Sequence, residues 1–469
     1  MSDSPFRLEV SGLKQPLAVT GFHGTEAISQ PYVFTLQVVC EPAQVAPAQL
    51  MYRSAFLAVD EQDTGFHGQI QGVEHQPHPG SETRYRLVLG PRLACLAQRC
   101  NVRVFQGLSA RQIIAQVLSE HGLRGEAHAF HLKVPCRPRA FCAQYQENDL
   151  QFVQRLCAEE GIHYHFAHSR QGHRLIFASG LYGARRSPPA PWHATTEGPA
   201  VTRFAMVPNE DPQAGRRAEG DSTLSFINSG RLFAMSGHAC EAWNGLWRVL
   251  HVEHAGQQRY GNRFVVQPWD ARVPIAAPPA QALPVVMRAW VMGAAGEPAD
   301  RDANGRVRVQ FDWIMQGAGA RFADCWLPVQ RQVRSPLLGG MPVLASPSRQ
   351  ADQPPQIIAC LSKASLSAEP PQEGQEPLQA CVSAAWLMGE RRTLQLRDGP
   401  LIELHEGAEL TLEVGASRVR LDAQSLALSA AALNFTHSVG EPAIAALQAP
   451  GDATQGQGAQ QHEEQEGQP

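Results

Sequence analysis

The chain has 469 residues, with 40 lysines and arginines against 44 aspartates and glutamates, for a formal net charge of -4. At roughly 150 residues per domain, this length predicts about three domains, enough to bury a core without disulfides or metals. The charge argues against partners that bind mainly through phosphates, such as bulk nucleic acid or an anionic membrane. The 40 glycines and 35 prolines, beside 7% aromatic residues, predict many turns and a β-rich protein.

The sequence lacks the patterns of a nucleotide loop and of a targeting signal. No glycine precedes Lys14, Lys133 or Lys363, the only lysines, so a phosphate-binding loop is absent. The N-terminus has no basic region followed by an apolar one, and no apolar stretch approaches the ~20 residues that span a bilayer. Cysteines such as Cys157 and Cys360 lie in apolar runs and are expected to be reduced, in a cytosolic protein. Export would then use a route independent of a signal peptide.

The first 90 residues predict strands separated by turns. Residues 32–38, 69–73 and 84–89 alternate apolar and polar side chains, which is the period of a half-buried strand. This part of the chain is therefore predicted to form a β-sheet with one buried face.

A helical insert is predicted over about residues 105–161. Ser109 is expected to cap a helix that ends at Gly122, and a second helix is expected from about Asn148 to Gly161. From Ile162 the period returns to two, and we expect His163 and His165 on the solvent face of that strand.

Three proline-rich stretches without periodicity, at 185–200, 273–284 and 367–377, predict domain boundaries or long crossovers. A tail rich in Gln, Gly, Ala and Glu ends the chain, and its composition predicts disorder because it cannot bury enough apolar area. The resulting divisions are 1–184 with the helical insert, 185–278, 285–362, 378–436 and the tail at 441–469.

The fourth division contains an eight-residue repeat. Gly399, Gly407 and Gly415 mark it, and short alternating segments lie between them. A strand of five or six residues with a one-glycine turn does not bury its apolar face within one chain, so other copies must cover it. This predicts an intertwined β-prism of three chains with glycines at its corners; a plain antiparallel hairpin ladder is the alternative. The residues predicted to fill the prism are Leu404, Leu412, Leu421 and Leu428.

Candidate catalytic and metal-binding residues were weighed along the whole sequence. His163, His165, His168 and His173 form the densest group, and a HxH pair on a strand is able to present two imidazoles to zinc, as in a metal-dependent hydrolase. A solvated strand face explains the same pattern without a metal. The pair Glu159-Glu160 does not converge on one bond, because adjacent helical residues point about 100° apart. We predict no catalytic residue, no cofactor and no metal.

Four segments carry a resemblance to a known family. They are residues 22–34 (FHGTEAISQPYVF), residues 139–162 (from RAFCAQYQENDL to EEGI), residues 244–254 with NGLW and VEH, and residues 305–313 (GRVRVQFDW). Together with the repeat, they resemble the VgrG family, the trimeric spike at the tip of the bacterial type VI secretion apparatus. The resemblance covers the chain from about residue 6 to about residue 435.

The resemblance implies a mainly β fold with a small helical insert. Residues 1–184 and 185–278 would form hub β-barrels, 285–362 an oligonucleotide/oligosaccharide-binding (OB)-like small barrel, and 378–436 a trimeric intertwined β-helix. The expected partners are two further copies of the chain, the Hcp tube, a PAAR-type tip protein, baseplate components and effector or adaptor proteins. Residues expected at the tip contact are Leu433, Asn434 and Phe435.

The implied function is mechanical and needs no enzymatic activity. The trimer would cap the Hcp tube, puncture a target envelope and deliver effectors, residing in the cytoplasm before firing and being secreted afterwards. A hub or needle protein of a phage or phage-like contractile tail is the alternative, because it would share the barrels and the prism.

Overall fold

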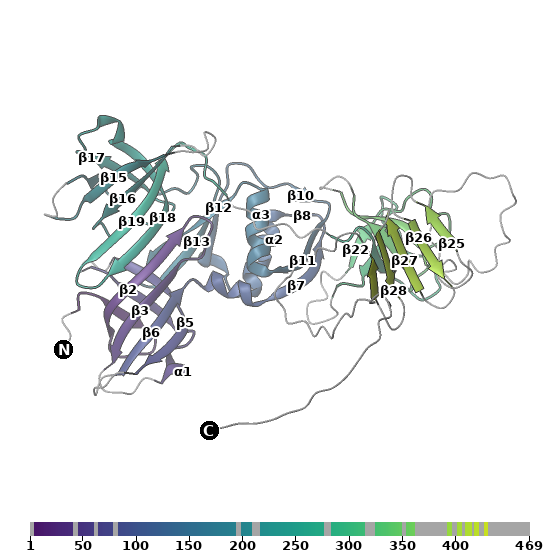
Figure 1. Ribbon diagram of the computed structural model, residues 1–469, viewed down its shortest axis with the longest axis horizontal. Helices are drawn as coiled ribbons and strands as arrows, with labels where there is room; N and C mark the ends of the chain where they lie inside the picture. Colours follow the sequence, from purple (N-terminus) through teal and green to yellow (C-terminus); the bar gives the residue numbers. More distant parts are fainter. Residues whose placement is uncertain are drawn as a thin grey trace, which may run out of the picture. The chain divides into compact units, whose positions relative to one another are not determined.

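In the computed structural model the chain divides into two compact units, Met1–Ala385 and Trp386–Pro469 (Figure 1). The fold is mainly β with a small helical insert, as predicted. None of the helices in the described part is long and apolar enough to cross a membrane. The structure describes residues 4–40, 46–60, 64–77, 83–193, 198–208, 216–275, 283–314, 324–348 and 353–361, and five strands between residues 392 and 429.

Six antiparallel strands form the first barrel. Their order is β1-β4-β5-β6-β3-β2, and pairing between β1 and β2 closes the ring. Alternation puts Phe34, Leu36 and Val38 inside, as the pattern of residues 32–38 predicted. The elements are β1 (Arg7–Val10), β2 (Leu17–Ala27), β3 (Val33–Cys40), the short helix α1 (Pro47–Leu50), β4 (Ser54–Ala58), β5 (Gly65–Gln76) and β6 (Thr83–Gly90).

The second barrel continues the same sheet. β2 pairs antiparallel with β18, so the two barrels share a hydrogen-bonded seam (Figure 1). From β18 the order runs β19-β16-β15 on one side and β17-β14 on the other, and a bridge between Trp192 and Val201 joins the two ends. The elements are β14 (Ala190–Pro191), β15 (Val201–Val207), β16 (Arg217–Ser222), β17 (Leu232–Ser236), the 3₁₀ turn η4 (Glu241–Trp243), β18 (Gly245–Gly256) and β19 (Tyr260–Pro268).

The helical insert contains the two predicted helices, α2 (Ala110–Glu120) and α3 (Asp149–Glu159). Ser109 and Asn148 are their N-caps, and each forms a reciprocal capping box with the glutamine three residues on. Gly122 and Gly161 follow the C-termini with φ of 73° and 66°, a conformation that favours glycine. The other elements are η1 (Arg92–Gln98), β7 (Cys100–Phe105), β8 (Leu108–Ser109), η2 (Gly125–Ala127), β9 (His128–His131), β10 (Pro138–Arg139), β11 (Cys142–Asn148), β12 (His163–Ser169) and β13 (Gly172–Ala178).

The prediction that His163 and His165 face solvent is wrong. Both lie on β12, and each is only 4% exposed. β12 pairs with β13, and Ser29 N donates to Tyr164 O at 2.7 Å, so this strand of the insert is hydrogen-bonded to the first barrel. Both of its faces are covered, and for this reason alternation in the sequence does not mark a solvated side.

A five-stranded antiparallel small barrel follows within the range 285–362. Its order is β22-β21-β20-β23-β24, and hydrogen bonds of Ile357 with Pro328 and Gln330 connect the first strand to the last. Its core includes Cys360, one of the buried free cysteines, as expected for a residue in an apolar run. The strands are β20 (Met287–Val291), β21 (Val307–Phe311), β22 (Asp324–Leu327), β23 (Pro342–Ser346) and β24 (Gln356–Cys360).

In the second unit five strands pair consecutively as an antiparallel ladder. This within-chain arrangement is the alternative raised by the sequence. The structure contains one chain, so the three-chain prism stays a prediction. The strands are β25 (Arg392–Gln395), β26 (Leu401–His405), β27 (Glu409–Val414), β28 (Ser417–Leu421) and β29 (Leu426–Ser429).

Candidate functional site

Asp149, the first residue of α3, organises the helical insert. Its side chain is fully buried, and its carboxylate accepts hydrogen bonds from Arg99 Nε at 2.6 Å, Gln144 Nε2 at 2.8 Å and Asn101 Nδ2 at 3.2 Å. His121 Nε2 lies 2.7 Å from the same carboxylate. Burial alone would raise the pKa of Asp149, but the hydrogen bonds from Gln144, His121 and Arg99 outweigh burial and lower it. The ionised carboxylate therefore connects elements that are distant in sequence.

A second carboxylate extends this network to the end of α2. Glu120 accepts from Arg103 Nη1 at 2.8 Å and also pairs with Arg99. Arg103 in turn donates from Nε to the side-chain oxygen Oε1 of Gln144 at 2.9 Å. The C-terminus of α2, the N-terminus of α3 and strands β7 and β11 are thus held by one set of charge-assisted hydrogen bonds.

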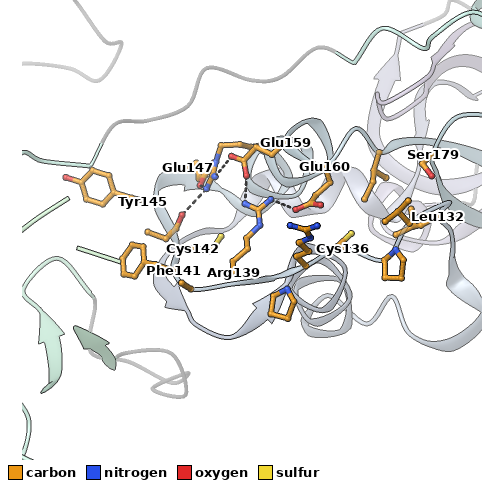
Figure 2. A pocket seen from close by; sticks show the side chains of 18 of the residues that line it. Leu132, Cys136, Arg139, Phe141, Cys142, Tyr145, Glu147, Glu159, Glu160 and Ser179 are labelled. Atoms are coloured by element: carbon orange, nitrogen blue, oxygen red, sulfur yellow. Dashed lines mark hydrogen bonds and ion pairs between the residues drawn. The ribbon is translucent and has the colours of Figure 1, made fainter. Parts of the chain in front are cut away.

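A pocket of about 970 Å³ lies beside α3 (Figure 2). Arg139 projects into it and pairs with both Glu159 and Glu160, the latter at 2.6 Å. Arg155 donates to Glu147 at 2.6 Å and to Glu159 at 2.8 Å. The two adjacent glutamates at the end of α3 are therefore committed to ion pairs, which the sequence did not predict.

The carboxylates and thiols of this pocket are in protonation states that suit ion pairing and packing, and not catalysis. Burial alone would raise the pKa of Glu159, but hydrogen bonds from Arg139 and Arg155 lower it, so the carboxylate stays ionised. Burial raises the pKa of the Cys142 thiol to about 11 and also raises that of Cys136, so both thiols are protonated near neutral pH. A protonated thiol is a poor nucleophile, and these carboxylates are already neutralised by guanidinium groups.

The insert also contacts the small barrel. Gln106 Oε1 accepts from Trp326 N at 2.7 Å, and Gln106 Nε2 donates to Trp326 O at 3.0 Å. The Tyr145 and Trp313 rings meet edge to face with centroids 5.3 Å apart, and Val104 of β7 is part of the small barrel's own core. At this joint the Gln106 side chain is hydrogen-bonded to the backbone of Trp326, and apolar side chains pack beside it. The two kinds of contact together restrain the position and the rotation of the small barrel relative to the insert.

The four histidines considered as metal ligands fall into two groups. His163 and His165 lie on one side of β12, with ring centroids 6.3 Å apart. His168 and His173 lie on the other side, where His173 Nδ1 is 3.1 Å from Nδ1 of His67. Among the residues that the structure describes, no three His, Cys, Asp or Glu side chains are arranged to hold a metal ion.

The four leucines predicted for the prism lie in the ladder at positions that share one face. Leu412 lies opposite Ile402 and Val419, and Val419 lies opposite Leu428. Leu404 and Leu421 both lie opposite Leu410 on its two neighbouring strands. Since directly opposed residues share a face, these positions form two apolar rows. The corner glycines Gly399, Gly407 and Gly415 and the tip residues Leu433, Asn434 and Phe435 lie outside the described residues.

Sequence reasoning missed the network around Asp149 and the joint to the small barrel. Arg99, Arg103 and His121 reach Asp149 from 50, 46 and 28 residues away, with no local motif among them. The available signal was the run of polar residues ending at Asn148, because a cap followed by an acid predicts a charge at a helix N-terminus.

Comparison with known proteins places the chain among contractile-tail proteins. Residues 25–213 match the family described as phage tail baseplate hub (GPD). The type VI secretion system spike protein VgrG4b of Pseudomonas aeruginosa is 34% identical over 412 residues, with 69% of this chain and 51% of the relative covered. Spike protein VgrG5 of the same organism is 30% identical over 426 residues, with 72% and 54% covered. The chain spans about half the length of these two relatives.

A solved structure shows the same fold. The E. coli c3393 protein is described as a component of the type VI secretion system with structural similarity to T4 bacteriophage tail proteins gp27 and gp5. It aligns with a TM-score of 0.64 at 24% sequence identity, covering 75% of this chain and 98% of that one.

Proposed function

Because this chain is a homologue of the VgrG spike proteins and carries the phage tail baseplate hub domain, we propose that it is the spike of a type VI secretion system. The observation that carries the proposal is the combination of a hub-type double barrel with a chain homologous to two spike proteins over about seven tenths of its length. The spike would act as a homotrimer whose hub caps the Hcp tube.

The proposed mechanism is mechanical. Sheath contraction would push the tube against the hub, and the load would pass through the insert and the small barrel to the C-terminal strands. The joint at Gln106 and Trp326 and the charge network around Asp149 suit this role because they oppose relative movement of the elements that carry the load. The protein itself would need no catalytic group for this task.

The finer partner assignments follow from the spike role. The C-terminal end would bear a PAAR-type tip protein, the hub would contact baseplate components, and effectors or their adaptors would travel with the spike. The protein would reside in the cytoplasm before firing and reach the extracellular space or a target cell without a signal peptide. These assignments rest on the resemblance to spike proteins and on the amphipathic C-terminal strands.

The native mass of the purified chain tests the homotrimer. A mass near three times 51.1 kDa, measured by light scattering or native mass spectrometry, supports the proposed spike. A monomer at micromolar concentration contradicts it. Binding to an immobilised ring of Hcp-type tube protein, compared with the tube protein of a contractile phage, tests the assignment to a secretion system.

The second candidate is a hub protein of a phage or phage-like contractile tail. The match of residues 25–213 to the phage baseplate hub family favours it. Preferential binding to the phage tube protein in the same experiment would select this candidate instead.

A further inference from the structure

Arg248 is a buried arginine with too few hydrogen-bond acceptors. It lies on β18, is 2% exposed and donates from Nη2 to Trp269 O at 3.1 Å. Its Nε and Nη1 have no partner. These two nitrogens carry three N–H groups, and a buried cation with unpaired donors is strongly penalised. Some acceptor is therefore required at this place.

Two histidines of the insert, His163 and His165, lie near enough to Arg248 to be affected by its charge. Val249, the next residue of β18, packs in the core of the second barrel, so Arg248 lies on the outer side of that sheet. Gly230 connects the two parts: its N donates to Val249 O at 2.9 Å, and a Cβ built on it would lie 2.3 Å from Cγ of His165. β12, with His163 and His165, thus lies directly against this part of the second barrel.

The histidines add donors to the same region. His163 and His165 are each 4% exposed, and Nδ1 of His165 has no partner. Burial, with a smaller contribution from the Arg248 charge, lowers the pKa of His163 to about 3 and that of His165 to about 4; the Glu26 charge opposes the shift at His165. The imidazoles are neutral near pH 7, and each retains one N–H to donate.

No carboxylate in the described part of the chain forms an ion pair with Arg248. Glu26 is the acid whose charge reaches His165. Its Oε1 accepts from Ser229 N at 2.9 Å and lies 3.3 Å from Nε2 of His254, and its Oε2 is buried without a partner, but Glu26 forms no ion pair with Arg248. Burial lowers the pKa of Arg248, and no acidic group opposes that shift. The positive charge is consequently left without a protein counter-ion.

We propose that a halide-sized anion binds at Arg248. It accepts hydrogen bonds from the N–H groups of the Arg248 guanidinium and of the His163 and His165 imidazoles. The small size follows from the burial of all three side chains, which leaves no opening for a larger ligand. The anion supplies both the missing acceptor and the missing negative charge. Its binding fastens the insert to the second barrel, which is a property separate from the proposed spike role.

Thermal unfolding of the full chain at pH 8 tests the site, with chloride replacing gluconate at constant ionic strength. We expect a saturable rise of the midpoint by roughly 3 to 5 °C, since a ligand of the native state stabilises by mass action. The matched variants are Arg248→Met, which should lose the chloride dependence, and Arg263→Met. Arg263 is an exposed arginine of the same barrel, paired with Asp221, and its variant should keep the dependence.

Two results would overturn the proposal. One is a wild-type midpoint that does not respond to chloride, which would mean that water fills the space. The other is a chloride response that survives in Arg248→Met. If that variant does not fold, anomalous scattering from a bromide-soaked crystal of the wild type decides the matter: a peak beside Nε or Nη1 of Arg248 supports the site, and the absence of a peak refutes it.

Discussion

Asp149 and Arg248 are both buried charges, but their surroundings differ. The Asp149 carboxylate receives charge-assisted and neutral hydrogen bonds from several elements, and its pKa is lowered in spite of burial. The cap at Asn148 was predictable because capping depends on local sequence. The donors that meet Asp149 were not, because they come from strands and helices that only the tertiary fold brings together.

The variant Asp149→Asn keeps the shape of the side chain and removes its charge. We expect it to lower the free energy of unfolding by about 2 to 4 kcal/mol, because the buried hydrogen bonds to Asp149 would lose their charge and only Glu120 would be left to pair with Arg99 and Arg103. Urea unfolding measures this loss. Asp221→Asn is the control: Asp221 pairs with Arg203 and Arg263 at an exposed site, where the cost should stay below about 1 kcal/mol. Equal losses in the two variants would contradict the role given to Asp149.

The buried histidines predict a loss of stability in acid. Burial lowers the pKa of His163 and His173 to about 3, and that of His165 and His168 to about 4, against about 6.5 in the unfolded chain. Between pH 6.5 and 4 the unfolded state binds more protons than the folded state, so stability falls as the pH falls. Each histidine contributes a slope of up to about 1.4 kcal/mol per pH unit.

Urea unfolding at several pH values between 7 and 4 measures this slope. The double variant His163→Gln, His165→Gln should flatten it, whereas His23→Gln, at an exposed position on β2, should leave it unchanged. A double variant with the wild-type slope would show that these histidines do not resist protonation in the fold.

The ends of the helices were easier to predict from the sequence than the burial of the strands. Both helices of the insert begin and end where caps and glycines predicted, because a capping box and a positive φ are properties of a few consecutive residues. The exposure of β12 was mispredicted for the opposite reason. An alternating pattern marks a solvated face only when one side of the strand stays open, and here the residues on both faces of β12 are buried.

The spacing of the leucines along the C-terminal strands is irregular, and this affects how the strands could assemble. Leu412 follows Leu404 by eight residues, but Leu421 follows Leu412 by nine. A strict eight-residue prism would therefore place Arg420 where the other repeats have leucine. In the ladder, Leu421 lies opposite Leu410 and stays on the apolar face. The four leucines thus lie at positions that share one face of the ladder within one chain, and in the proposed trimer other copies would cover that face.

The variant Leu412→Asp tests whether this face assembles the proposed trimer. We expect loss of the trimer, because a charge would have to be buried among aliphatic side chains of the other copies. Thr411→Asp is the matched control, since residue 411 lies on the opposite face of the same strand. Sedimentation or light scattering gives the mass of each variant. A Leu412→Asp protein that remains a stable trimer would refute both the prism and any assembly through this face.

At the scale of the whole molecule, the contacts hardest to predict link distant parts of the chain. The seam between β2 and β18 and the hydrogen bonds between Gln106 and Trp326 join residues more than 200 positions apart. No periodicity encodes such pairings, because each strand alone looks like any other half-buried strand. The family motifs were informative there: two of the four, residues 22–34 and 244–254, contain parts of the seam strands.

A chain truncated after Leu361 separates the roles of the two units. The first unit has its own apolar cores in the barrels and the insert, so we expect the truncated chain to fold with a cooperative melt and a β-type circular dichroism spectrum. It should also be monomeric, if the apolar face of the C-terminal strands supplies most of the area buried between copies. Light scattering of the truncated and full chains at equal concentration makes the comparison. Two trimers would place the main trimer contacts in the hub, and the needle would then depend on the hub for its assembly.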